Sequence, residues 1–129
     1  TVPKITITLR KSYGGSHIVM GCKQLRSDLN FAWPSSEIAV MGASGAVAIL
    51  CGKEAKAKKE AGEDVKAFLA EKEDEYTEKF ANPYEAASYG YIDDVIEPRN
   101  TRFRICRGLA QLATKRQQLP AKKHGCMPM

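Results

Sequence analysis

The chain has 129 residues, 43% of them hydrophobic, and a net charge of +5. Its length favours a single core-forming domain, and no run of about 18 apolar residues predicts a membrane-spanning helix. The charge is uneven, because residues 98–129 hold eight Lys and Arg and no acidic residue, whereas residues 1–97 have a net charge of −3. Such a basic end attracts phosphate, but it contains one aromatic residue, Phe103, and no nucleic-acid-binding signature, so we expect no nucleic-acid partner.

The four cysteines show no CxxC pair, and neither histidine stands at a metal-ligand spacing from them. We therefore expect no metal site. The sequence also lacks a charged-then-apolar leader, which predicts free thiols in a reducing, cytoplasmic compartment without membrane insertion. The chain begins at Thr1 and enters a strand-like run almost at once, so we expect it to be a piece of a longer protein. The cysteines are Cys22, Cys51, Cys106 and Cys126.

The first predicted elements are a strand and a helix joined by a glycine turn. Residues 3–9 alternate apolar and polar side chains, which is typical of a strand. Apolar residues at spacings of three and four then predict a helix over 16–25, with Ser16 as its N-cap. Residues 28–34 predict an irregular or short extended piece. A second buried strand is expected at 37–41.

The order of strand, glycine turn and helix then occurs a second time. Residues 42–50 predict a turn followed by an apolar helix, and the apolar residues after the turn favour tight packing of the strand against the helix. Residues 53–62 are rich in Lys and Glu and predict a solvated helix or a mobile loop. An amphipathic pattern predicts a long helix from residue 63 to residue 81.

The remaining elements alternate in the same way. Pro83 opens a short helix that Gly90 ends, and residues 91–96 predict a third strand. A last helix is expected from residue 98 to about residue 116, and a tail without periodicity follows it. The apolar stripe of this helix holds Phe103, Cys106, Leu109, Ala110 and Ala113. Alternating strands and helices indicate an α/β unit, but three strands are too few to cover these helices, so we expect the missing strands from another part of the chain or from a partner.

The turn Gly14-Gly15-Ser16 is the most informative junction. A first helical turn leaves amide groups without intrahelical partners, and glycine lets another group approach the backbone closely. Such a turn suits either a phosphate or an oxyanion that develops in a reaction. A GxGxxG or Walker motif is absent, which disfavours the phosphate. A purely structural turn remains the alternative.

Several motifs in the same order carry a family resemblance. They read "VPKITITLRKSYGGSHIVMG", "LNFAWPSSEIAVMGASGAV", "YGYIDDVIEPRNTRFRI" and "PAKKHGCMPM". The chain resembles the biotin-dependent acyl-CoA carboxyltransferase subunits, a family that includes the β subunit of propionyl-CoA carboxylase and the α subunit of methylmalonyl-CoA decarboxylase. The resemblance runs over nearly the whole chain and is weakest at residues 52–63.

The resemblance implies a crotonase-like α/β fold, with short strands alternating with helices and long C-terminal helices. Family subunits are much longer and have two such halves, and residues 1–129 match the C-terminal part of the second, biotin-side half. The implied activity is carboxyl transfer between N1′ of biotin and the α-carbon of an acyl-CoA, with methylmalonyl-CoA or propionyl-CoA as the expected substrate. The choice between carboxylation and decarboxylation stays open.

The resemblance implies a role for each residue of the turn Gly14-Gly15-Ser16. The resemblance implies that the backbone amides of Gly15 and Ser16 are the catalytic donors that stabilise the ureido oxygen of biotin, with Gly14, Gly15 and Ser16 forming the biotin-binding turn. Family members often have Ala then Tyr where this chain has Ser16 and His17. Ile18 stands where some propionyl-preferring members carry Asp. The resemblance therefore implies that His17 and Ile18 influence substrate specificity.

The resemblance also implies partners. Biotin is expected on a biotin carboxyl carrier protein, the substrate is a CoA thioester, and full-length subunits are expected to form trimer-based hexamers. The turn that holds the acyl thioester belongs to the other half, so we expect the isolated chain to be inactive. The alternative hypothesis is a non-catalytic module whose helices, at 64–81 and 99–116, dock subunits.

Overall fold

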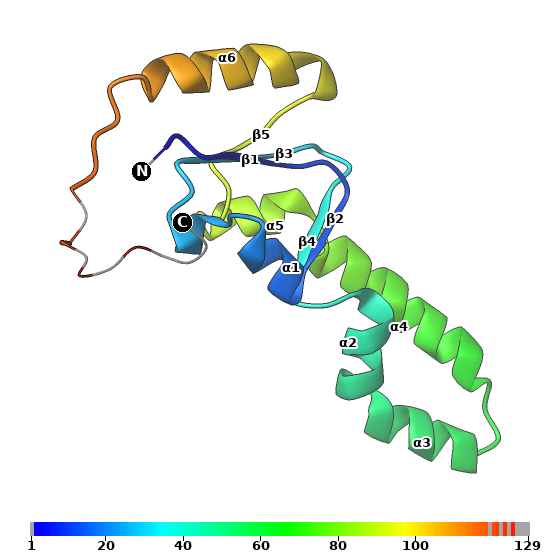
Figure 1. Ribbon diagram of the computed structural model, residues 1–129. Helices are drawn as coiled ribbons and strands as arrows, with labels where there is room; N and C mark the ends of the chain where they lie inside the picture. The colour runs from blue at the N-terminus through cyan, green and yellow to red at the C-terminus, as the bar shows by residue number, and fades with distance from the viewer. Residues whose placement is uncertain (1, 119, 122, 124, 126–129) are drawn as a thin grey trace.

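The computed structural model describes residues 2–118, 120, 121, 123 and 125, and in this range strands alternate with helices (Figure 1). The strands are β1 (Ile5–Thr8), β2 (Lys11–Tyr13), β3 (Leu29–Ala32), β4 (Glu37–Ala39) and β5 (Asp94–Val95). The helices are α1 (Gly14–Val19), α2 (Ala43–Leu50), α3 (Gly52–Glu60), α4 (Val65–Phe80), α5 (Pro83–Ser88) and α6 (Thr101–Gln111). Two 3-10 turns are η1 (Lys23–Leu25) and η2 (Pro98–Asn100).

All strand pairs are parallel. One sheet has the order β1-β3-β5, with Ile5 opposite Leu29, and a second sheet pairs β2 with β4, with Ser12 opposite Ile38. Parallel neighbours need a crossover between them, and here the crossover from β1 and β2 to β3 and β4 contains α1 and η1. The predicted α/β class is therefore confirmed.

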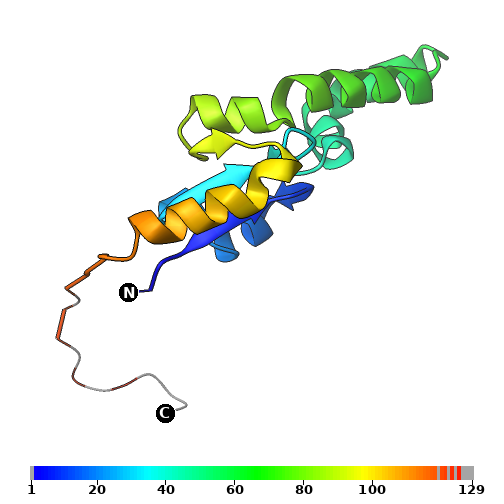
Figure 2. The ribbon, with the colours of Figure 1, turned by 90° about the horizontal axis from the view of Figure 1, so that it is seen from above.

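The helices cover the strands from two sides. Figure 1 shows α6 on one side of β1 and β3, and α1 and α5 on the other. The α6 contact is close because Gly108 is buried: a Cβ atom there would lie 2.7 Å from Leu29 Cδ1 and 3.1 Å from Ile5 Cδ1. Helices α2, α3 and α4 form a helical arm (residues 43–80) that projects from one end of the strands (Figure 2).

The first junction differs from its prediction. Strand β1 lies within the predicted run 3–9, but an unpredicted strand, β2, follows it. Strand β2 leads directly into α1, whose N-cap is Tyr13 rather than Ser16. The Ser16 hydroxyl instead donates a hydrogen bond to the Tyr13 carbonyl oxygen at 2.7 Å. The helix ends at Val19, and Gly21 has a φ of +99°, so the predicted continuous helix over 16–25 is wrong. A short strand and a short helix that follow one another are hard to separate by periodicity alone.

The second half follows the predictions more closely. The long helix α4 begins after its N-cap, Asp64, whose carboxylate accepts hydrogen bonds from backbone amides of the first turn. Pro83 is at the start of α5, and Gly90, with a φ of +72°, follows its end. The Lys- and Glu-rich segment is a helix, α3, without buried residues.

The last helix is shorter than predicted, and its predicted apolar stripe is partly exposed. It ends at Gln111, and Phe103 and Leu109 of the predicted apolar stripe are 60% and 47% exposed. The buried residue that packs on the sheet is Gly108, which the stripe did not include. In the predicted tail, residues 119, 122, 124 and 126–129 lie outside the described part of the chain.

The fully buried core is small. A cluster of four residues connects β3, β4, α5 and the loop before β5, and it consists of Ala32, Ile38, Ala86 and Ile92. Many large apolar side chains are instead exposed, among them Val19, Met20 and Val40. Within the described residues, helices are all too short or too polar to cross a membrane.

An ion pair joins three distant segments. The Asp28 Oδ2 atom accepts a hydrogen bond from the Lys4 backbone amide at 2.7 Å and another from the Lys115 ammonium group at 2.8 Å. Lys115 also donates a hydrogen bond to the Val2 carbonyl oxygen at 3.0 Å. The side chains of Lys115 and Asp28 are only 10% and 16% exposed. The hydrogen bond from Lys115 is the main cause that lowers the pKa of Asp28 below its ordinary value of 3.8. This contact fixes the segment after α6 against the start of β1 and the loop before β3.

We predict that Asp28→Asn lowers the free energy of unfolding in a pH-dependent way. Because the folded-state pKa of Asp28 is lowered, its stabilising effect is fully present above 3.8 and is lost as the pH falls through the lower folded-state value. Urea midpoints should therefore differ between wild type and variant near neutral pH and converge in strong acid. Asp74→Asn, at an exposed position of α4, should show no difference at either pH. A deficit that stays constant into strong acid would contradict the ion pair.

Candidate active-site cleft

The turn from β2 into α1 requires glycine at its first position. Gly14 has a φ of +51°, in the left-handed region that side chains other than glycine rarely adopt. A Cβ atom at Gly14 would lie 2.9 Å from the Val40 carbonyl oxygen. The close approach joins the end of β2 to the segment that follows β4. Gly14 is therefore needed for the path of the chain as well as for access to the turn.

The next two residues expose their backbone. Gly15 and Ser16 lie at the solvent-exposed start of α1, and a Cβ atom at Gly15 would have no neighbour within 4 Å. No side chain caps this helix terminus in the described structure, and the Ser16 hydroxyl is already bonded to the Tyr13 carbonyl oxygen. The first-turn amides of α1 are thus available to an outside acceptor.

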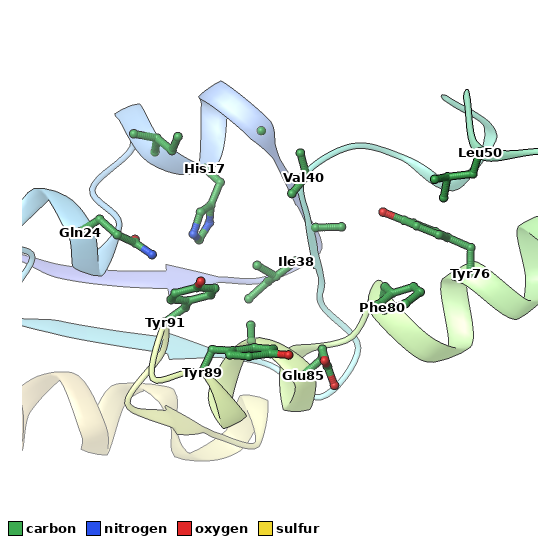
Figure 3. Close-up of a pocket in the computed structure, with 14 residues that line it drawn as sticks. His17, Gln24, Ile38, Val40, Leu50, Tyr76, Phe80, Glu85, Tyr89 and Tyr91 are labelled. Atoms are coloured by element: carbon green, nitrogen blue, oxygen red, sulfur yellow. The ribbon is translucent and has the colours of Figure 1, made fainter. Parts of the chain in front are cut away.

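A cleft of about 640 Å³ opens beside this turn (Figure 3). Gly14, His17 and Ile18 line it, whereas Gly15 and Ser16 lie outside its lining, on the exposed side of the same helix. The other lining residues are Gln24, Ile38, Ala39, Val40, Leu50, Tyr76, Phe80, Glu85, Ala86, Tyr89 and Tyr91. The cleft is thus mostly apolar and aromatic, with few polar groups, as ligand sites commonly are.

Aromatic side chains from two segments form one side of the cleft. Tyr76 and Phe80 come from α4, with ring centroids 5.3 Å apart, and Tyr89 and Tyr91 flank Gly90, with ring centroids 5.9 Å apart. The first pair lies within the long helix predicted at residues 63–81, but the sequence pattern does not connect it to the second pair. Both pairs line the same cleft, because α5, which contacts β4, connects α4 to the segment of Tyr89 and Tyr91.

His17 is held in place by a strand residue. Its Nδ1 atom lies 2.9 Å from the Ser12 hydroxyl oxygen, in a partly buried position. Burial lowers the pKa of His17 below its ordinary value of 6.5. The imidazole is therefore neutral at neutral pH and lines the cleft as a polar, uncharged group.

Tyr13 connects the two glycine turns. Its hydroxyl donates a hydrogen bond to the Glu37 carboxylate, and burial together with Glu37 raises the pKa of Tyr13 to about 12. Its ring also lies 3.6 Å from the position of a Cβ atom at Gly42, the N-cap of α2. The second turn thus packs against the first, and Ala46 and Val47 of α2 are buried. Tyr13 has no local sequence signal for this role, because its partner Glu37 is remote in the chain.

The described residues contain no group of three or more His, Cys, Asp and Glu placed to hold a metal ion. Cys22, Cys51 and Cys106 are free thiols, and Cys22 is buried. Cys126 and His124 lie outside the described residues. The chemistry available at the cleft is therefore that of backbone amides, one imidazole, tyrosines, one glutamine and one carboxylate.

Comparison with known families identifies the class. The carboxyl transferase domain model matches residues 1–127, so the chain belongs to the carboxyl transferase domain family. The chain is 50% identical over 129 residues to the propionyl-CoA carboxylase beta chain of Saccharopolyspora erythraea, covering 100% of this chain and 24% of that protein. It is 52% identical over 128 residues to the methylmalonyl-CoA carboxyltransferase 12S subunit of Propionibacterium freudenreichii subsp. shermanii, covering 99% of this chain and 24% of that subunit. The methylmalonyl-CoA decarboxylase subunit alpha of Propionigenium modestum is 50% identical over the whole chain, which covers 24% of that subunit.

Solved structures show the same fold. A crystal structure of transcarboxylase 12S, described as a hexamer assembly with methylmalonyl-coenzyme A and methylmalonic acid bound, matches with a TM-score of 0.87 at 52% identity, over 100% of this chain and 24% of that one. The β subunit of geranyl-CoA carboxylase from P. aeruginosa matches with a TM-score of 0.67 at 28% identity, over 87% of this chain and 21% of that one. The expected crotonase-like fold and family are confirmed. The chain spans about a quarter of the length of these relatives.

We predict that substitution by alanine destabilises the protein at Gly14 but not at Gly15. Gly14→Ala should lower the free energy of unfolding by about 2 kcal/mol, because it combines a left-handed backbone with a Cβ atom too close to the Val40 carbonyl oxygen. Gly15→Ala should change stability by less than about 0.5 kcal/mol, because it meets open space. Chemical unfolding of both variants measures the contrast, and equal stability of the two would show that the turn is relaxed.

Proposed function

We propose that this chain is the biotin-side part of an acyl-CoA carboxyltransferase subunit. In the full-length protein, residues 1–129 form the C-terminal part of its C-terminal domain. The reaction is carboxyl transfer between N1′ of biotin and the α-carbon of an acyl-CoA, and a methylmalonyl-CoA decarboxylase or a propionyl-CoA carboxylase contains such a subunit. The observation that carries the proposal is the exposed, uncapped start of α1 in a chain that matches the carboxyl transferase domain model over residues 1–127.

The turn has the properties that a developing oxyanion needs. Two backbone amides, those of Gly15 and Ser16, are free of side-chain caps, and the missing side chain of Gly15 leaves room for a ring to come close. Biotin, when bound, supplies the ring nitrogen that carries the carboxyl group. The two amides would hold its ureido oxygen.

The neighbouring residues fit a role in substrate choice. His17 and Ile18 line the cleft directly after the amide donors. Ile18 is apolar and about half exposed, so it offers acyl chains a hydrophobic surface without a charge. The relatives include proteins named for propionyl-CoA and for methylmalonyl-CoA, and acyl groups of this small size are the substrates we propose.

Partners and location follow from the same proposal. Biotin reaches the site on a biotin carboxyl carrier protein, and full-length subunits assemble into trimer-based hexamers, in keeping with the hexamer assembly reported for transcarboxylase 12S. The turn that holds the thioester oxygen comes from the other half of the subunit, so residues 1–129 alone are inactive. We place the protein in the cytoplasm, which the free thiols of Cys22, Cys51 and Cys106 favour.

A docking role is the second candidate function. Phe103 and Leu109 on the outer side of α6 are largely exposed, and exposed apolar residues on one helix face favour contact with another chain. A docking module and an enzyme part respond differently to changes in the glycine turn.

We predict that Gly15→Val in the full-length protein reduces carboxyl transfer by about a hundredfold while the oligomeric state stays the same. The valine meets no neighbour in the chain, so it would obstruct only a group that approaches the amides from outside. Turnover assays and size-exclusion chromatography measure the two effects.

The matched control is Gly52→Val. Gly52 also has no neighbour within 4 Å of a Cβ atom, and it starts α3, in the helical arm. This variant should keep transfer within about twofold of wild type. Full activity of Gly15→Val, or loss of assembly with it, would favour the docking module over the enzyme part.

A further inference from the structure

The polar groups of the cleft are divided between its two ends. Figure 3 shows the His17 ring beside Gln24 and Tyr91, with Glu85 on the far side of Ile38. The donors His17, Gln24 and Tyr91 therefore lie at one end of the cleft, which we call the donor end, away from the Glu85 carboxylate. A ligand with a negative group is repelled by Glu85 and attracted to the donor end.

The Ser12 contact determines which ring nitrogen His17 offers. Within the described residues, the Ser12 hydroxyl has one hydrogen-bond partner, His17 Nδ1, at 2.9 Å. A hydroxyl proton needs an acceptor, and Nδ1 is the acceptor within reach, so we assign the proton to this bond. Nδ1 then carries a lone pair, and the neutral imidazole has its proton on Nε2. The ring nitrogen left for a ligand is a donor.

The residues around His17 favour a hydrogen bond from its Nε2–H group to a charged oxygen. His17 is partly buried, and burial lowers its pKa, so it stays neutral and donates one hydrogen bond instead of acting as a cation. Apolar neighbours such as Ile18 and Ile38 have no side-chain polar group that would compete for a charged oxygen bound at this end of the cleft.

We propose that His17, oriented by Ser12, is a substrate-binding residue whose Nε2–H donates a hydrogen bond to the carboxylate of a carboxylated acyl-CoA. The proposal rests on the function proposed above and adds the chemical group that His17 recognises. Ser12 is a positioning residue, since it acts through the ring of His17. The site thereby distinguishes an acyl-CoA that carries the transferable carboxylate from one that does not.

The test compares two ligands that differ by that carboxylate alone. Calorimetric titration of the full-length protein with methylmalonyl-CoA and with propionyl-CoA gives two dissociation constants without a turnover measurement. His17→Phe should weaken methylmalonyl-CoA binding about tenfold, the effect of one hydrogen bond to a charged group, and change propionyl-CoA binding by less than about twofold. His17→Gln, which keeps a side-chain N–H at a similar reach, should restore most of the difference.

Equal weakening of both ligands by His17→Phe, or no change in either, would overturn the assignment to His17. If both variants keep the oligomeric state and melting temperature of the wild type, a folding defect is not the cause of the weaker binding. Failure of wild-type protein to bind either CoA thioester would instead refute the proposed function, and the assignment with it.

Discussion

The close approach between Gly14 and the Val40 carbonyl oxygen is the contact on which the cleft depends. It lets β2 end beside the segment after β4 and continue into α1 without a loop. A side chain at this position would separate the two, and the strand pair β2–β4 would lose its register at one end. Three features of the site follow from this path: the amides at the start of α1 are exposed, His17 faces the cleft, and Ser12 lies within hydrogen-bond distance of His17.

The second half of the chain supplies the opposite side of the same space. The helical arm carries Tyr76 and Phe80, and the Asn82-Pro83 break redirects the chain so that Tyr89 and Tyr91 reach the cleft as well. The site therefore combines an exposed turn that offers amides with an adjacent cleft that offers aromatic rings. Amides suit an oxygen that gains charge, and aromatic rings suit the uncharged remainder of a ligand.

Local patterns predicted much of this fold. The two strand–turn–helix units, α4 and the Pro83 start of α5 follow from periodicity and from caps, which depend on neighbours in the sequence. The glycine turn was recognised for the same reason. The exact start of α1 was not predicted. Serine is a preferred N-cap residue, which favoured Ser16, but β2 runs to Tyr13 because it pairs with β4, and this pairing decides where the helix starts.

The cleft itself could not be predicted, because remote pairings create it. The contact between Tyr13 and Glu37 spans two strands, and the aromatic residues of α4 approach β4 only through the fold of α5. The apolar stripe predicted for α6 does not include Gly108, where the sheet accepts this helix because a small residue permits close contact. A small residue carries no hydrophobic signal, so the pattern could not identify this contact.

A structure of the full-length subunit with biotin bound tests the central claim most directly. We expect the ureido oxygen within about 2.7–3.2 Å of the backbone nitrogens of Gly15 and Ser16, the distance of an N–H to oxygen hydrogen bond. A biotin ring that binds elsewhere, or one whose ureido oxygen bonds to side chains while these amides face water, would contradict the account.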